Sequence, residues 1–537
     1  MIKTETWRAV ILPFTSEMEY ENPFLDVVIE AEFTGPNGEK IVREAYWDCG
    51  KDYKVSFAPT AEGIWKYVIK APAETGLNGT SGEIECVPYK GDLDIYKHGF
   101  LKVSKDRTYL TYADGTPFFW LGDTHWEFAY RERWDWSNHP DMDSMFKGMA
   151  DKRAAQHYTV YQTNLRSDPM NRQGGESPYW ESGQFGKLPK VSFYKEEIDR
   201  RMNYLADLGL VNALGFSWFM SVIDHVEDWK NMARYFIARY GALPIVWTTA
   251  GEVAGYFPEK RQEFIDLWRE VALYIEEHDS YGNLQTAHYD NVRPFSDYYY
   301  DEEWFDFTLN QAGHGDFPVK ARDFQEYREK HPDKPFVEGE ALYEFCSTLE
   351  EHGTRLCTAD MVRRVAYTAV QLGACGYTYG AQGIWDCVYE KPETVTDLAG
   401  FNRFGITWYE AIDGEGGKQM GYMKDFYMEN HFEEMKPVCA DSVSFFGVKS
   451  GKEVDMHSPL ATGNKDMNRF IVYYNENTRG GCRINGVKGS KVLAKWYDPR
   501  ENTYIPADAA LFKLETGTLD LPGRSKQKDW LLVVEVN

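Results

Sequence analysis

Apolar and polar residues alternate in short runs at both ends of the chain. Residues 25–33 alternate in this way, and turn-forming Gly, Pro and Asn residues separate this run from the next. Residues 468–474 and 530–536 show the same strand-like pattern near the C-terminus. Short strands separated by turns are typical of antiparallel sandwiches. We therefore predict one β-sandwich domain over residues 1–95 and another over residues 438–537.

The middle of the chain, residues 96–437, has a different pattern. Apolar positions recur three or four residues apart in 196–209 and 258–277, as expected for one face of a helix. Eight apolar runs of strand length lie between such helical segments: 117–122, 159–162, 211–216, 244–248, 284–287, 305–309, 335–340 and 374–379. Eight β/α units predict an α/β fold, a (β/α)8 TIM barrel flanked by the two sandwiches.

Polar and aromatic residues close these runs, at the strand ends where barrel enzymes form their active sites. Carboxylates, amides, imidazoles and indoles dominate, which is typical of a site for a neutral polyhydroxy ligand. Glu252 follows the fourth run and Glu340 closes the seventh, so we expect the two to face each other across the barrel mouth. The other candidate binding residues are Asp123, His125, Trp126, Asn164, Trp218, His288, Tyr289, Gln311, His314, Tyr379 and Trp385, and Arg166 also follows the second run.

A facing pair of carboxylates is what glycoside hydrolysis requires. One carboxylic acid protonates the leaving oxygen, while the other carboxylate attacks the anomeric carbon or activates the attacking water. Glu338 and Glu340 are two residues apart and share one face of the predicted strand. We favour Glu340 because it lies nearer the strand end, whereas Glu338 would lie deeper and need a buried partner.

Composition narrows the class of protein. The chain has 59 Lys and Arg against 84 Asp and Glu, a formal net charge of −25, which argues against a nucleic-acid partner. Aromatic residues make up 16% of the chain, which favours an aromatic-lined cleft. No apolar run is long enough to span a membrane. The eight cysteines form no Cys-x-x-Cys pair, so we expect reduced thiols and a cytoplasmic location.

Three segments resemble the apiosidase-like catalytic domain, the family that includes glycoside hydrolase family 140 in clan A. HGFLKVS (98–104) and GTPFFWLGDTHW (115–126) resemble the start of that domain, and KPFVEGEALYE (334–344) resembles its strand-seven motif. The sandwich that commonly precedes this domain is similar to residues 1–95, with FAP at 57–59 and EGIWKY at 62–67. The C-terminal region resembles the β-domain that often follows.

The resemblance implies a retaining enzyme with Glu252 as acid/base and Glu340 as nucleophile. It also implies that Asp123, His125 and Trp126 help to line the sugar subsite. The chain departs from the clan pattern at Gly251, where clan members usually carry Asn. We expect an exo-acting glycosidase for a plant-derived glycan or glycoside, with no cofactor and no metal, and with homo-oligomerisation left open.

Two alternatives remain open at this stage. A metal-dependent barrel hydrolase would use Asp123, His125, His288 and His314 as candidate ligands, although such enzymes need paired imidazoles on the first strand. A non-catalytic carbohydrate-binding protein would have the same fold but would not need both carboxylates.

Overall fold

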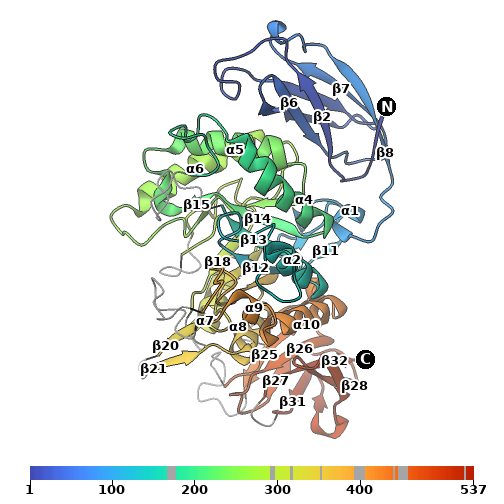
Figure 1. Ribbon diagram of the computed structural model, residues 1–537. Helices are drawn as coiled ribbons and strands as arrows, with labels where there is room; N and C mark the ends of the chain where they lie inside the picture. Colours follow the sequence, from blue (N-terminus) through green and yellow to red (C-terminus); the bar gives the residue numbers. More distant parts are fainter. Residues whose placement is uncertain are drawn as a thin grey trace.

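A computed structural model describes residues 1–165, 177–290, 297–314, 319–350, 353–391, 405–438, 442–445, 457–524 and 528–537. Figure 1 shows three regions in series, with a β-rich region at each end and a helix-rich region between them. The N-terminus lies in one β-rich region and the C-terminus in the other.

The N-terminal region consists of two sheets packed face to face. Phe33 from one sheet stacks on Phe57 from the other, with ring centroids 3.7 Å apart, and Trp65 is fully buried beside them. The larger sheet contains, in spatial order, β1 (Ile2–Glu5), β8 (Ser81–Val87), β7 (Gly63–Lys70), β3 (Glu30–Thr34) and β4 (Lys40–Glu44). The smaller sheet contains β2 (Val10–Thr15), β6 (Asp52–Phe57) and β5 (Tyr46–Cys49), and the short helix η1 (Ala73–Thr75) precedes β8.

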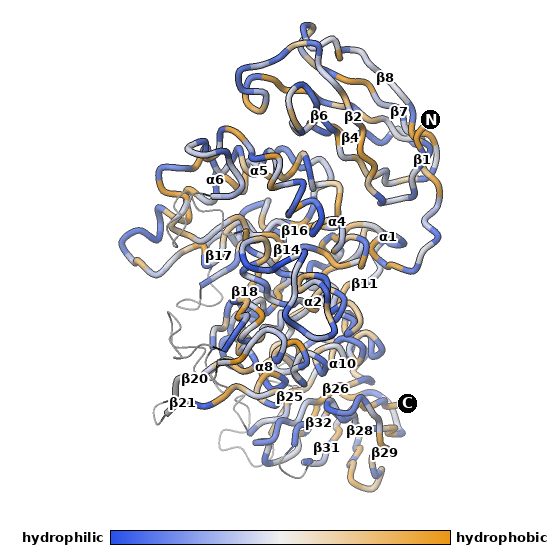
Figure 2. Tube along the Cα trace, viewed as in Figure 1, coloured by the Kyte–Doolittle hydropathy of each residue, from blue (hydrophilic) through white to orange (hydrophobic). Residues whose placement is uncertain are grey.

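These strands show the alternation that a one-sided core requires. β3 has the burial pattern intermediate, buried, exposed, buried, exposed, because successive side chains point to opposite faces of a sheet. Burial alternates similarly along β2 and β7, and Figure 2 shows hydrophobic and hydrophilic residues mixed along the strands of this region.

The central region is a mixed α/β structure built on a curled parallel sheet of seven strands. In spatial order these are β16 (Ile245–Trp247), β14 (Val211–Gly215), β13 (Val160–Asn164), β12 (Trp120–His125), β22 (Gly376–Tyr379), β19 (Phe336–Glu340) and β18 (Thr308–Gln311). Nearly every residue of these strands is buried, as expected for a parallel sheet covered on both faces. Seven of the eight predicted runs therefore correspond to strands.

The prediction that the fifth run, 284–287, forms a regular strand was wrong. Within the described residues it forms only isolated bridges, from Gln285 to Trp247 on one edge of the sheet and from the adjacent His288 to Leu309 on the other. At this position the N–H of Gln285 donates to the side-chain carboxylate of Asp306 at 2.8 Å rather than to a backbone carbonyl.

Helices cover the central sheet and connect its strands. The longer ones are α2 (Met145–Ala155), α4 (Asp199–Asp207), α5 (Val226–Tyr240), α6 (Arg261–His278), α7 (Val319–Lys330), α8 (Ala359–Gln371) and α10 (Glu415–Glu429). Short helices are α1 (Asp94–Lys97), α3 (Val191–Phe193), η2 (Tyr194–Ile198), η3 (Phe219–Val222), α9 (Trp408–Ala411) and η4 (Phe432–Glu434). The two helices predicted from apolar periodicity correspond to η2 with α4 and to α6.

Short strands complete the central region. They are β9 (Lys102–Val103), β10 (Leu110–Thr111) and β11 (Pro117–Phe118) before the first parallel strand, β15 (Ser217–Trp218) paired with β17 (Ala250–Gly251), and the hairpin β20 (Ser347–Glu350) with β21 (Gly353–Leu356).

The C-terminal region again contains two sheets with a shared core, in which Ile484 and Leu532 are fully buried. One sheet contains β23 (Lys436–Pro437), β25 (Leu460–Gly463), β26 (Arg469–Tyr474), β32 (Trp530–Val536), β28 (Val492–Asp498) and β29 (Thr503–Pro506). The other contains β24 (Val443–Phe445), β27 (Cys482–Asn485), β31 (Thr518–Leu521) and β30 (Lys513–Glu515), with η5 (Ala509–Leu511) at its edge.

Two observations concern the solvent and redox setting. Cys439 lies outside the described residues; the other seven cysteines are free thiols, and all of them except Cys49 are buried. Within the described part of the chain, no helix is both long and apolar enough to cross a membrane.

A buried arginine joins the N-terminal region to the centre. Arg43 of β4 donates hydrogen bonds to the carbonyl of Ser56 at 3.1 Å and to the carbonyl of Ile237, near the end of α5, at 2.6 Å. The guanidinium faces the negative end of the helix dipole, where a cation is favoured.

We predict that Arg43→Met destabilises the protein by about 2–4 kcal/mol, because two carbonyls then lose a charged donor in a buried position. Urea unfolding of the full chain measures this loss. Lys40→Met, at an exposed position of the same strand, is the control and should change stability by less than about 0.5 kcal/mol. Equal stabilities of the two variants would contradict the role of Arg43.

Candidate active site

The loop that carries Glu252 has an unusual backbone. Thr249 and Glu252 both have φ of 51°, in the left-handed region that residues other than glycine rarely occupy. The residues between them form β17, which pairs with β15 from the loop after β14. Strained backbone of this kind is retained where the surrounding structure enforces it, and such sites are often functional.

Glycine is required at position 251 because neighbouring side chains leave no space for a Cβ atom, and not because of the backbone φ angle. A Cβ atom at this position would lie 2.5 Å from the indole of Trp218 and 3.2 Å from Nδ2 of Asn164. The Asn that clan members usually carry before the acid/base therefore has no room here. The Trp218 ring occupies that space, and Asn164 places its amide beside it while donating to the carbonyl of Ser217 at 2.9 Å.

Glu340 ends β19 and is only 6% exposed. Nε2 of His288 lies 3.3 Å from one of its oxygens, and Nε2 of His314 lies 3.4 Å from the other. Burial on its own would raise the pKa of the Glu340 carboxyl, but the two nearby imidazoles outweigh burial and lower this pKa to about 2. Glu340 is therefore held as a carboxylate.

Glu252 lies in the opposite electrostatic situation. Its pKa is raised, first by burial and then by the negative charge of Glu340. Oε1 of Glu252 accepts hydrogen bonds from the hydroxyl of Tyr256 and from Nε2 of Gln311, the latter at 3.4 Å. Gln311 pairs in register with Glu340 on the neighbouring strand, so the residue that donates to Glu252 lies beside Glu340 in the sheet. Tyr256 was not predicted, because nothing in the sequence shows that the loop folds back onto Glu252.

Aromatic side chains form a wall around the two carboxyl groups. Trp126 packs edge-on against both Trp218 and His288, with centroid distances of 5.7 and 5.3 Å. Its indole N–H donates to the hydroxyl of Tyr343 at 3.1 Å, and the Tyr343 ring lies 4.8 Å from His314. Tyr343 was missed as a site residue, although it lies within the strand-seven motif at 334–344.

Several polar atoms in this neighbourhood have no protein partner. Among the described residues, Nδ1 of His288, Oε1 of Gln311 and Nε1 of Trp218 are buried without a hydrogen bond. Buried polar groups are normally satisfied, so a cluster of unsatisfied ones beside a carboxylate pair suits the hydroxyls of a ligand.

Glu338 lies deeper in the same strand, as the strand alternation predicts. It is fully buried, and its oxygens accept hydrogen bonds from Nδ2 of Asn310 at 2.6 Å and from the N–H of Ala312 at 2.9 Å. Both oxygens are thus engaged in fixing the end of β18.

Asp123 and His125 form a different network, fully buried beneath the wall. Nε2 of His125 contacts Asp123 at 3.0 Å, and its Nδ1 contacts Glu132 at 2.6 Å. Arg153 donates to Asp123 at 2.6 Å. Burial by itself would lower the pKa of His125, but the two carboxylates raise it to about 9. The recorded hydrogen bonds of Asp123 and His125 therefore join them to each other, to Arg153 and to Glu132, and not to Glu252 or Glu340.

The remaining predicted residues occupy varied positions. Tyr379 is buried and donates to Glu344 at 2.5 Å, and Tyr289 is a core residue whose ring stacks on Phe305. Trp385 is half-buried, and its ring lies 6.2 Å from that of Tyr343. Arg166 lies outside the described residues.

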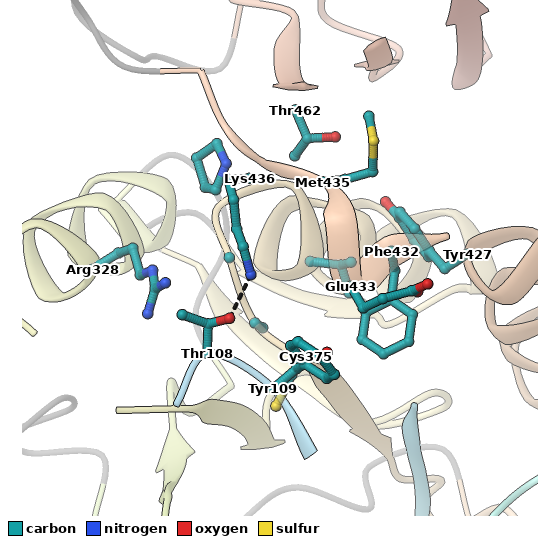
Figure 3. A pocket seen from close by; sticks show the side chains of 14 residues that line it. Thr108, Tyr109, Arg328, Cys375, Tyr427, Phe432, Glu433, Met435, Lys436 and Thr462 are labelled. Atoms are coloured by element: carbon teal, nitrogen blue, oxygen red, sulfur yellow. Dashed lines mark hydrogen bonds between the residues drawn. The ribbon is translucent and has the colours of Figure 1, made fainter. Parts of the chain in front are cut away.

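A small pocket at the far end of the central sheet is separate from this site. Its cavity volume is about 20 Å³, room for roughly one water molecule. Figure 3 shows that it lies between Thr108, Arg328 and Lys436, with Nζ of Lys436 donating to the Thr108 hydroxyl. Cys375 of its lining directly precedes β22, so the pocket lies at the N-terminal end of the parallel strands, opposite the carboxylate pair.

The ligands proposed for a metal-dependent hydrolase do not form one cluster. Within the described residues, the three groups close enough to share an ion are His431, Glu433 and Glu434, at and just before η4. His288 and His314 instead approach Glu340, as described above.

Family comparison agrees with the fold. The model of the apiosidase-like catalytic domain matches residues 104–434, more than half of the chain, and the protein therefore belongs to this family. Residues 3–72 match a domain of unknown function (DUF5060). Residues 448–535 match a domain described, provisionally, as the collagen-binding domain of a collagenase. None of the curated proteins that were compared matches the chain.

Solved structures share the fold over most of the chain. A glycoside hydrolase is 24% identical with a TM-score of 0.65, covering 83% of this chain and 99% of its own. A glycoside hydrolase of family 5 from Bacteroides vulgatus is 22% identical with a TM-score of 0.67, covering 84% and 96%. A third structure, from the same organism and provisionally described as a glycoside hydrolase, is 15% identical with a TM-score of 0.70 over the full length of both chains.

The lowered pKa of Glu340 predicts a pH-dependent contribution to stability. A carboxyl group with a folded pKa of about 2 and an ordinary value of 4.5 stabilises the fold above pH 4.5, and this contribution is lost as the pH falls toward 2. Between pH 6 and pH 3, the free energy of unfolding should fall by roughly 2 kcal/mol more in the wild type than in Glu340→Gln.

Urea unfolding across this pH range measures the difference. Glu263→Gln, at an exposed position of α6, is the control and should follow the wild type. Parallel pH profiles for the wild type and Glu340→Gln would show that Glu340 is not held as a carboxylate by the imidazoles.

Proposed function

We propose that this protein is a retaining glycoside hydrolase in which Glu340 is the nucleophile and Glu252 the acid/base. The observation that carries the proposal is the opposite shift of the two pKa values, raised at Glu252 and lowered at Glu340. A nucleophile must be ionised and a general acid must be protonated at the same pH, and environments that separate two carboxyl pKa values assign these roles.

In the first step, a carboxylate oxygen of Glu340 forms a bond to the anomeric carbon. The bond from that carbon to the leaving oxygen breaks, and the leaving oxygen takes its electron pair together with the proton of Glu252. In the second step, water attacks the anomeric carbon and gives a proton to Glu252. The bond to Glu340 breaks, and Glu340 regains its negative charge.

The charge of Glu340 also explains how one residue serves as acid and then as base. That charge contributes to the raised pKa of Glu252 in the free enzyme. Once Glu340 is esterified the charge is gone, so the pKa of Glu252 falls and its carboxylate is ready to accept a proton from water. When the ester is hydrolysed the charge returns, and Glu252 is again favoured in its protonated form.

Residues around the pair support this role. His288 and His314 hold the Glu340 carboxylate in place, and Gln311, the register partner of Glu340, donates to Glu252. We further propose that residues 284–288 close the parallel sheet into a (β/α)8 barrel, since their bridges reach both edge strands.

Membership of the apiosidase-like family supports a plant-type glycan or glycoside as substrate, and we propose exo-action on it.

We predict that Glu252→Ala slows hydrolysis of glycosides with poorly acidic leaving groups by about 10²–10⁴-fold, because their leaving oxygen must be protonated. In kcat/KM, which reports the first step alone, dinitrophenyl glycosides need no such proton and should lose far less. Sodium azide should restore turnover by entering the vacated space, giving a glycosyl azide with the substrate's anomeric configuration. Release of the phenol and proton NMR of the product measure both effects.

The matched control is Glu259→Ala, an exposed glutamate farther along the same loop, which should retain wild-type rates. Equal losses for both kinds of leaving group would contradict the role of Glu252. A glycosyl azide of inverted configuration would contradict the retaining mechanism.

A further inference from the structure

Three large apolar side chains are exposed on η3 and on the segment that follows Glu252. Met220 and Tyr256 are each 42% exposed and Phe257 is 44% exposed, whereas most large apolar residues of the central region are buried. Met220 lies in η3, and the other two lie in the segment that follows Glu252. We call these three residues the apolar rim.

The apolar rim is held by a buried scaffold. The ring of Phe219, only 4% exposed, lies 5.8 Å from Tyr256 and 6.2 Å from Phe257. Gly255 allows this approach because it has φ of 62° and because a Cβ there would lie 2.4 Å from the Phe219 ring. The carbonyl of Phe219 accepts a hydrogen bond from the indole of Trp268 on α6 at 3.1 Å. The rim is therefore built on anchored segments.

The rim adjoins the acid/base directly. The Tyr256 hydroxyl donates to Oε1 of Glu252, so its ring extends from the carboxyl group that would protonate the leaving oxygen. The leaving group must lie on the side of the acid/base, because the proton is delivered to its oxygen. The polar groups His288 and His314 gather instead at Glu340, on the side where the sugar ring would bind.

We propose that the apolar rim is the binding site for the leaving group and that the preferred substrates are glycosides with an aromatic or apolar aglycone. This inference rests on the proposed function and names its substrate class. Met220 and Phe257 offer apolar surface, which an aromatic or apolar leaving group can cover. Placing a phenyl ring against them removes apolar area from water, at about 25 cal/mol per Å².

The test compares the benzyl and methyl glycosides of one sugar, whose leaving alcohols have nearly equal acidity. The difference in kcat/KM therefore reports binding of the phenyl ring rather than leaving-group chemistry. We expect the wild type to prefer the benzyl glycoside by about 10–100-fold, the range that one to a few apolar groups supply in a pocket.

Phe257→Ala and Met220→Ala should each reduce this benzyl-to-methyl ratio by about 3–10-fold, and the double variant should reduce it further. Leu273→Ala removes a similarly exposed apolar side chain from α6 and should retain the wild-type ratio. Circular dichroism and thermal unfolding verify that each variant is folded.

A wild-type ratio near one, or an unchanged ratio in both rim variants, would overturn the assignment of the rim while the glycosidase function stands. A disaccharide of the same sugar cleaved faster than the benzyl glycoside would also overturn it. Failure to hydrolyse any glycoside in a panel of sugars would instead refute the proposed function, and with it this inference.

Discussion

A buried carboxylate must be paired or protonated, because transferring an isolated charge out of water is very costly. Glu340 meets this constraint through His288 and His314, which keep it ionised at the end of β19. Glu252 is partly buried, and its pKa is raised first by burial and then by the charge of Glu340. The paired charge at Glu340 thus contributes to the opposite pKa shifts of the two carboxyl groups, and the proposed chemistry depends on that asymmetry.

The fold supplies this pair from elements far apart in the chain. Glu252 comes from a loop with two left-handed residues, stabilised by the pairing of β15 with β17, and Val253 donates from its N–H to the carbonyl of His288 at 3.0 Å. The loop that carries Glu252 and the histidine beside Glu340 are therefore connected through the backbone.

Much of the architecture could be predicted from the sequence. The seven buried parallel strands correspond to apolar runs, and the helices between them show clear periodicity. The run at 284–287 could not be distinguished from a strand, since the hydrogen bond from the N–H of Gln285 to the Asp306 carboxylate involves a residue distant in sequence.

Glu252 and Glu340 could be predicted as a pair because strand ends determine position, and their roles stay a prediction. The positions of Tyr256 and Tyr343 at the site could not be predicted, because they depend on loop conformation. His125 illustrates the same limit, since only the structure shows that Asp123 and Glu132 occupy both of its nitrogens.

The central claim is that Glu340 becomes covalently attached to the sugar. A 2-deoxy-2-fluoro glycoside with a dinitrophenyl leaving group, made from a sugar that the enzyme hydrolyses, slows the second step more than the first and allows the intermediate to accumulate. Mass spectrometry of the digested protein then locates the label. The account predicts one fluorosugar per chain, on Glu340. A label on any other residue, or inactivation without a covalent label, would contradict it.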